Sequence, residues 1–87
     1  MPFRAVVDGS VRIAGRAGTA VFLRSFEGAI EDGARLVFRS QAGTFHAVVR
    51  SVEFARVRGG ETLGLMIEDL EPPQIPEGTE IASEPEP

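Results

Sequence analysis

Apolar and polar residues alternate over short stretches of this chain, and glycines separate the stretches. The apolar positions are rich in Val, Ile and Phe, and no segment shows the i, i+3, i+4 spacing of an amphipathic helix. Alternation with a period of two between glycines is typical of half-buried β-strands. The pattern predicts strands at Phe3–Val7, Val11–Ala14, Thr19–Arg24, Arg35–Arg39, Thr44–Phe54, Thr62–Ile67 and Thr79–Ala82.

Glycine and proline mark the connections between these strands. The segment GAIEDG, residues 28–33, indicates a loop, because its final glycine is free to take a positive φ. QAGT at 41–44 and RGGE at 58–61 predict hairpin turns. Pro72 and Pro73 cannot donate hydrogen bonds to a β-ladder, so we expect a rigid connection there.

The predicted strand Thr44–Phe54 is long for a small barrel, and its alternation slips where Val48 and Val49 are both apolar. A bulge near Arg50 would absorb the slip and let one strand serve two sides of a barrel. Open sheet edges in a chain of 87 residues would invite aggregation. We therefore expect an all-β fold, a small closed and mainly antiparallel β-barrel over residues 1–82, with a disordered acidic tail at 83–87.

Length and composition are those of one globular domain. The chain has 87 residues, of which 43% are hydrophobic and 25% are charged. It has no cysteine, which excludes disulfides and thiolate chemistry. We identify no signal peptide, and no apolar run approaches the roughly 20 residues that span a bilayer. These features predict a cytoplasmic protein that does not associate with membranes.

The charges are divided between the two parts of the chain. Nine arginines and five acidic residues give residues 1–60 a net charge of +4, while eight acidic residues and no basic residue give residues 61–87 a net charge of −8. Such asymmetry can mark a polyanion-binding body with an acidic tail. Charges that serve only solubility are the alternative.

The sequence offers little material for catalysis. His46 is the only histidine, and without cysteines it predicts no metal site. The serines lie in no Gly-x-Ser-x-Gly motif. The acid pairs Glu31–Asp32 and Glu68–Asp69 fall in predicted turns or at strand ends, where solvation explains them. We expect no enzyme activity, no metal and no cofactor.

Five segments, in order, carry a resemblance over residues 3–82: FRAVVDGSVRIAGRAGTAVF, GAIEDGARLVF, VVRSVEFAR, GETLGLMIEDL and IPEGTEIA. Together they resemble domain 2 of elongation factor Tu and related translational GTPases. The resemblance implies a closed antiparallel barrel in which Gly15 and Gly18 turn the chain, and in which Gly64 allows close backbone approach in the core. The chain has no lysine and no phosphate loop, so we expect no GTP binding by that mechanism.

The resemblance also implies binding residues. In that family, a glutamate and an arginine three residues later face the 3′-terminal adenosine of aminoacyl-tRNA, and these positions match Glu53 and Arg56. A carboxylate can accept a hydrogen bond from a ribose hydroxyl, and a guanidinium can hold a phosphate or carbonyl oxygen. With Arg50 and Arg58 they form the candidate site. The alternative is an exposed cross-strand pair, worth on the order of a few tenths of a kcal/mol.

Arginines could also form a phosphate-tracking patch, for which the guanidinium geometry is well suited. The candidates are arginines 12, 16, 24, 35, 39, 50, 56 and 58. The chain lacks tryptophan and tyrosine, so base stacking would fall to phenylalanine. Phe26 is the best candidate for an exposed ring, and most of the others are expected in the core.

These observations leave three interpretations of function. The first is a non-catalytic translation-factor-like barrel that binds RNA, either a tRNA 3′ end or ribosomal RNA. The alternative is a protein–protein interaction module without nucleic-acid binding, which acts through an exposed barrel face or the acidic tail. In the third, the tail covers the basic face of its own or a neighbouring barrel and regulates RNA binding.

Overall fold

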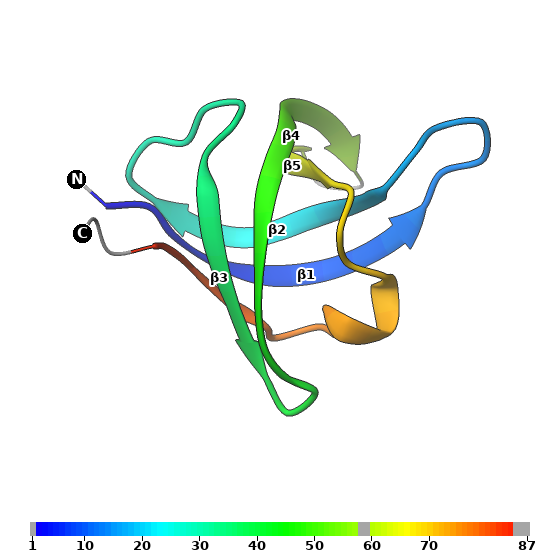
Figure 1. Ribbon diagram of the computed structural model, residues 1–87. Coiled ribbons are helices and arrows are strands. Elements are labelled where there is room, and N and C mark those ends of the chain that lie inside the picture. The colour runs from blue at the N-terminus through cyan, green and yellow to red at the C-terminus, as the bar shows by residue number, and fades with distance from the viewer. Residues whose placement is uncertain (1, 58–59, 85–87) are drawn as a thin grey trace.

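The computed structural model describes residues 2–57 and 60–84, with side chains for residues 2–53 and 62–84. Within them, six antiparallel strands in the order β1–β2–β5–β4–β3–β6 form a closed barrel (Figure 1), which confirms the predicted fold class. The elements are β1 (Arg4–Arg12), β2 (Thr19–Glu27), β3 (Arg35–Ser40), β4 (Gly43–Val57), β5 (Gly60–Ile67), the 3₁₀-helix η1 (Pro72–Gln74) and β6 (Glu80–Ser83).

The short strand β6 closes the barrel. It pairs with β1 on one side and with β3 on the other, so that Ile81 lies between Ala5 and Phe38. Phe3 N donates to Ser83 Oγ at 2.9 Å, and Ser83 N donates to the Phe3 carbonyl at 3.0 Å. The two ends of the chain therefore meet at one end of the barrel (Figure 1).

The interior is filled by apolar side chains that point inward from every strand. Phe3 and Phe38 belong to this core, as expected, and both are fully buried. Leu70 and Ile75, from the connection between β5 and β6, also pack into the core. The buried Thr19 hydroxyl donates to the Leu70 carbonyl at 2.7 Å, which fixes this connection against β2. Because the interior is filled, binding surfaces must lie on the outside.

Two strand predictions differ in outcome. The sequence predicted two strands, Phe3–Val7 and Val11–Ala14, but the structure has the single strand β1 over Arg4–Arg12, whose register shifts between Val6 and Gly9. A bulge there lets one strand continue where the sequence pattern breaks, so the prediction of two strands was wrong. The predicted bulge near Arg50 is confirmed, because the ladder of β4 with β5 shifts between Val49 and Ser51.

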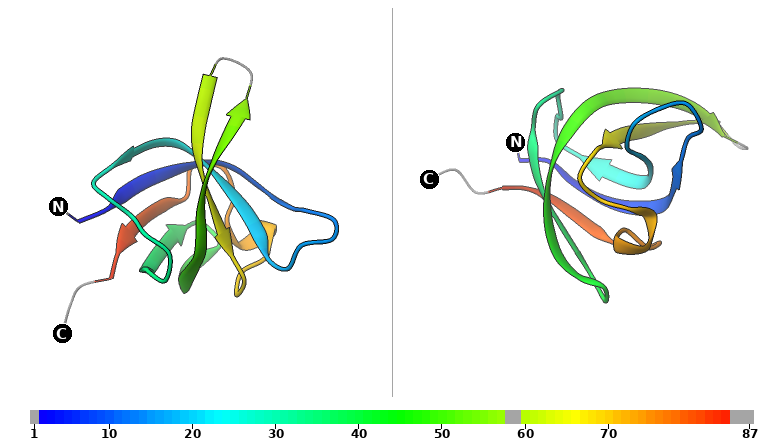
Figure 2. Two further views of the ribbon diagram at one scale, coloured as in Figure 1. Left: turned by 90° about the horizontal axis from the view of Figure 1, so that it is seen from above. Right: turned by 45° about the vertical axis from the view of Figure 1, so that its right-hand side comes forward.

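The outer part of the β4–β5 hairpin projects from the barrel as a two-stranded ribbon (Figure 2). Here β4 and β5 pair with each other up to Val57 and Gly60, whereas β2 pairs with β5 only over Gly64–Ile67. The predicted turn at RGGE includes Arg58 and Gly59, which lie outside the described residues.

The loop between β1 and β2 turns at two glycines in the left-handed region. Gly18 has a φ of +96°, and a Cβ atom added to it would lie 2.7 Å from the carbonyl oxygen of Ile67. Gly15 has a φ of +81°, but a Cβ atom there would meet nothing within 4 Å. The loop therefore lies directly against β5 at Gly18 and is open to solvent at Gly15.

Alanine substitutions test this contact. We expect Gly15→Ala to lower the free energy of unfolding by about 1 kcal/mol, the cost of a left-handed backbone alone. Gly18→Ala should cost about 3 kcal/mol or more, because the new methyl group also overlaps the Ile67 carbonyl. Urea and thermal unfolding followed by far-UV circular dichroism would measure both. Equal losses would contradict the close packing of the loop on β5.

Candidate functional site

Glu53 lies on the outer face of the barrel, where the β4–β5 ribbon leaves it. It pairs with Gly64 of β5, which in turn pairs with Phe22 of β2. Ala20 and Met66 lie on the same outer face but are only 5% and 4% exposed. Ile13 and Arg16 of the β1–β2 loop lie beside them.

Arg16 connects this loop to β4. Its guanidinium donates from Nη1 to Glu53 Oε1 at 3.2 Å and from Nη2 to Oε2 at 2.8 Å. The Ser51 hydroxyl donates to Oε2 at 2.9 Å. Both partners remain accessible, with 47% of the Arg16 side chain and 41% of the Glu53 side chain exposed.

A pocket of about 100 Å³ lies beside this ion pair, between the loop and the sheet. Its apolar lining comes from Ile13, Ala20, Phe22, Leu65 and Met66, and its polar lining from Arg16 and Glu53. Ligand pockets for drug-sized molecules are typically about 300–1,000 Å³. This pocket therefore suits one small group, such as a single base or a single amino-acid side chain.

Gly64 also lines the pocket. A Cβ atom added to it would lie 3.5 Å from the Glu53 carbonyl oxygen, which is ordinary van der Waals contact. The expectation that Gly64 permits an unusually close backbone approach was therefore wrong. Its missing side chain keeps the pocket open, because a side chain at this position would share the outer face with Phe22 and Glu53.

The hydrogen bond from Arg16 is the main reason that the pKa of Glu53 lies below its ordinary value. The Ser51 hydroxyl and the charge of Arg16 act in the same direction, while desolvation opposes them. The same hydrogen bond raises the pKa of Arg16. The pair is therefore ionised at neutral pH. A carboxylate offers about four acceptor positions, so Glu53 can accept a further hydrogen bond.

Of the four predicted site residues, the structure places only Glu53 at this pocket among the side chains that it describes. Glu53 lines the pocket, whereas Arg50 lies at the β4 bulge and forms an ion pair with Glu68. Arg56 belongs to β4, where it pairs with Glu61, but its side chain lies outside the described residues, as does Arg58. Arg16 was predicted only as one member of a phosphate-tracking patch. Its pairing with Glu53, 37 residues away, has no local sequence signal.

The two oppositely charged parts of the sequence meet in the fold. Arg12 forms an ion pair with Glu71 at 2.6 Å, and Arg24 forms one with Glu77 at 2.8 Å. Arg50 pairs with Glu68, and His46 Nδ1 lies 2.9 Å from Glu84 Oε1. Arg12, Arg24 and Arg50 of the predicted basic patch are therefore paired with acidic residues of the same chain. Each exposed pair contributes about 0–1 kcal/mol to stability.

Within residues 2–57 and 60–84, no group of three or more His, Asp or Glu residues is arranged to hold a metal ion. The same described residues contain no helix that is long and apolar enough to cross a membrane. No protein-family model matches the chain, and no curated protein matches it significantly.

The titration of Glu53 tests the geometry of the ion pair. In Arg16→Gln we expect the pKa of Glu53 to rise towards its ordinary value, with a smaller rise in Ser51→Ala, because each change removes a hydrogen bond to the carboxylate. Carboxyl ¹³C NMR across acidic pH would measure it. The stabilisation from this group is present above the ordinary glutamate pKa and is lost as the pH falls.

Arg12→Gln provides a matched control, because Arg12 pairs with Glu71 instead. It should leave the titration of Glu53 unchanged. A pKa of Glu53 that is the same in Arg16→Gln and in wild type would contradict the bidentate contact.

Proposed function

We propose that this chain is a non-catalytic RNA-binding module of the translation-factor domain 2 type, and that the pocket beside Glu53 receives the terminal nucleoside of an RNA chain. The observation that carries the proposal is the accessible Arg16–Glu53 pair at the edge of an apolar pocket of about 100 Å³. The closed antiparallel barrel agrees with the resemblance to domain 2 of elongation factor Tu. That relationship is part of the proposal.

The chemistry of the pocket suits a nucleoside. An apolar surface that includes Phe22 and Met66 can accept the face of a base. The remaining acceptor position on Glu53 can take a hydrogen bond from a ribose hydroxyl, and the 2′-hydroxyl is what distinguishes RNA from DNA. Arg16 can share its guanidinium with a phosphate or a base carbonyl while it stays paired with Glu53.

No chemical step is assigned to these groups. Both oxygens of the Glu53 carboxylate already accept hydrogen bonds, and the lowered pKa of Glu53 makes it a weak base. The proposed role is to hold an RNA end in a fixed position, with specificity from the contact of Glu53 with the ribose and affinity from the apolar pocket and Arg16.

Filling the pocket tests the proposal most directly. Gly64→Val should preserve the fold, because a Cβ atom is tolerated there and valine favours strands. We expect it to weaken binding of a 5′-fluorescein-labelled RNA hexamer that ends in adenosine by about tenfold or more, since the base can no longer enter. Fluorescence anisotropy at 50–150 mM salt would measure the affinity, and thermal unfolding would verify the fold.

Matched variants separate the pocket from general electrostatics. Glu53→Ala and a 2′-deoxyadenosine end on the RNA should each weaken binding by about three- to tenfold, and together by no more than either alone, because each removes the same hydrogen bond. Arg24→Gln removes an arginine that does not line the pocket and should change affinity by less than about twofold. No binding at low salt, or equal affinity in Gly64→Val and wild type, would refute the proposal.

A further inference from the structure

Phe22 stands on the outer face of the barrel between two glycines. In the sheet it lies directly opposite Gly9 of β1 on one side and directly opposite Gly64 of β5 on the other. Residues that lie directly opposite each other project from the same face of a sheet. Neither neighbouring strand therefore places a side chain beside this half-buried ring in its own row.

The backbone does not require glycine at either position. The φ angle of neither Gly9 nor Gly64 lies in the left-handed region. A Cβ atom added to Gly9 would meet nothing within 4 Å, and one added to Gly64 would come no closer than 3.5 Å to another atom. Glycine inside a strand costs conformational entropy and often marks the close approach of a ligand. The two glycines therefore point to a use of the space that they leave open beside Phe22.

The open spaces on the two sides of Phe22 are separate. On the β5 side the ring borders the pocket beside Glu53, and its Cδ1 lies 3.9 Å from the position of a Cβ atom at Gly64. On the β1 side, neither Gly9 nor Val11 lines that pocket. Val11 lies two residues along β1 on the same face and is 46% exposed. The space over Gly9 is thus a second position beside the same ring, with an exposed apolar side chain next to it.

We propose that Phe22 separates the last two bases of the bound RNA, with the terminal base in the pocket beside Glu53 and the penultimate base over Gly9. This inference rests on the proposed function and narrows its ligand from a terminal nucleoside to a dinucleotide end. Aromatic side chains stack on the unstacked bases of single strands, and phenylalanine can act as a wedge between adjacent bases. Because every base has a face on which to stack, the identity of the penultimate base is not selected.

The dimensions of the sheet agree with two bases around one ring. Neighbouring strands are about 4.8 Å apart, so Gly9 and Gly64 lie about 10 Å apart across β2. Two bases that hold one ring between them are about 7 Å apart, twice the stacked spacing of about 3.4 Å. Arg24, two residues further along β2, is held by Asp8 and Glu77. The second position therefore contributes affinity through stacking and not through charge.

Removal of the penultimate base alone tests the proposal. The probe is the fluorescein-labelled RNA hexamer ending in adenosine, either intact or with an abasic penultimate nucleotide. The abasic RNA should bind wild type about tenfold more weakly, and Gly9→Val should weaken binding of the intact RNA to the same extent. Together they should cost no more than either alone, because each removes the same stacking contact. Fluorescence anisotropy would measure these ratios, which should be equal at low and moderate salt because stacking is not screened.

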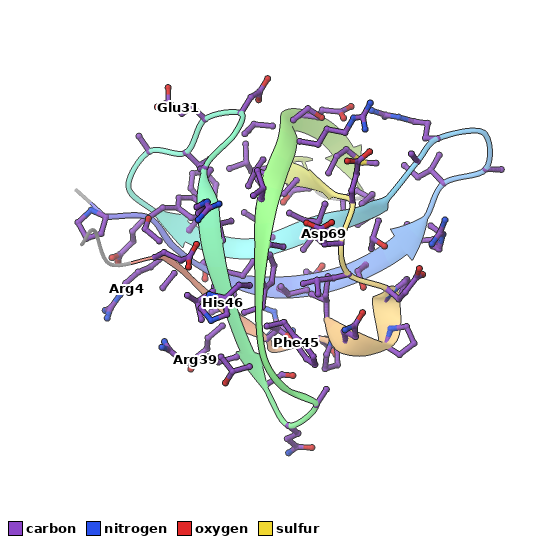
Figure 3. The ribbon with its side chains drawn as sticks, viewed as in Figure 1. Arg4, Glu31, Arg39, Phe45, His46 and Asp69 are labelled. Carbon is purple, nitrogen blue, oxygen red and sulfur yellow. The ribbon has the colours of Figure 1, made fainter. Side chains whose placement is uncertain are left out.

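Matched variants keep the result specific, and thermal unfolding would verify that each folds. Gly64→Val should weaken binding of the intact and the abasic RNA alike, since it blocks only the terminal base. Gly9→Ala leaves more space than Gly9→Val and should bind more tightly. Ser25→Val adds the same side chain at an exposed position of β2 and should change the affinity by less than about twofold. Ser25 lines a separate groove of about 460 Å³ across β2, β1, β6 and β3, where Figure 3 shows Arg4 and Arg39 on the same side of the barrel.

The outcomes distinguish this inference from the proposed function. If Gly64→Val weakens binding while the abasic RNA and Gly9→Val behave as the intact RNA and wild type do, the pocket for one nucleoside stands and the inference is overturned. The inference is also overturned if Gly9→Val weakens the intact and the abasic RNA equally, because the lost contact is then not with the penultimate base. No RNA binding by wild type would overturn the proposed function and this inference with it.

Discussion

The pairing of β6 on both sides is the interaction on which the rest of the barrel depends. This four-residue strand is the only link between β1 and β3 among the described residues, and it places Ile81 between Ala5 and Phe38 in the core. Without it, the edges of β1 and β3 would expose unpaired backbone groups. Closure satisfies those groups and fixes which strands are neighbours, which then determines the composition of every outer surface.

Because the interior of the barrel is filled, a ligand could bind only on the outside. Two structural features shape the outer surface. The β1–β2 loop folds over β2 and β5, where Gly18 contacts the Ile67 carbonyl and Arg16 reaches Glu53. The other feature is the groove across β2, β1, β6 and β3, which exists only because β6 joins the two outer strands. The outside of the barrel therefore has two hollows whose linings differ in chemistry.

The ion pairs show how the fold redistributes charge. Basic residues from the first part of the chain meet acidic residues from the second part, as in the pairs Arg12–Glu71 and Arg24–Glu77. This resembles the interpretation in which the acidic region covers a basic face, but the acids involved lie within and beside the barrel. The net charge of the whole chain therefore does not describe the individual surfaces. One positive and one negative group meet in the Arg16–Glu53 pair, and the arginines and glutamates in the groove around Arg39 are equal in number.

The sequence by itself determined the barrel, the bulge near Arg50 and the exposure of Phe26, because period-two alternation, glycine turns and a slip in polarity are local signals. It also singled out Glu53. Only the tertiary structure decided that Arg16 is its partner, that Gly64 leaves a pocket open, and that Arg4 and Arg39 share a groove. These contacts join residues far apart in the chain. They depend on strand order and on loop placement, which closure by β6 sets and local pattern does not encode.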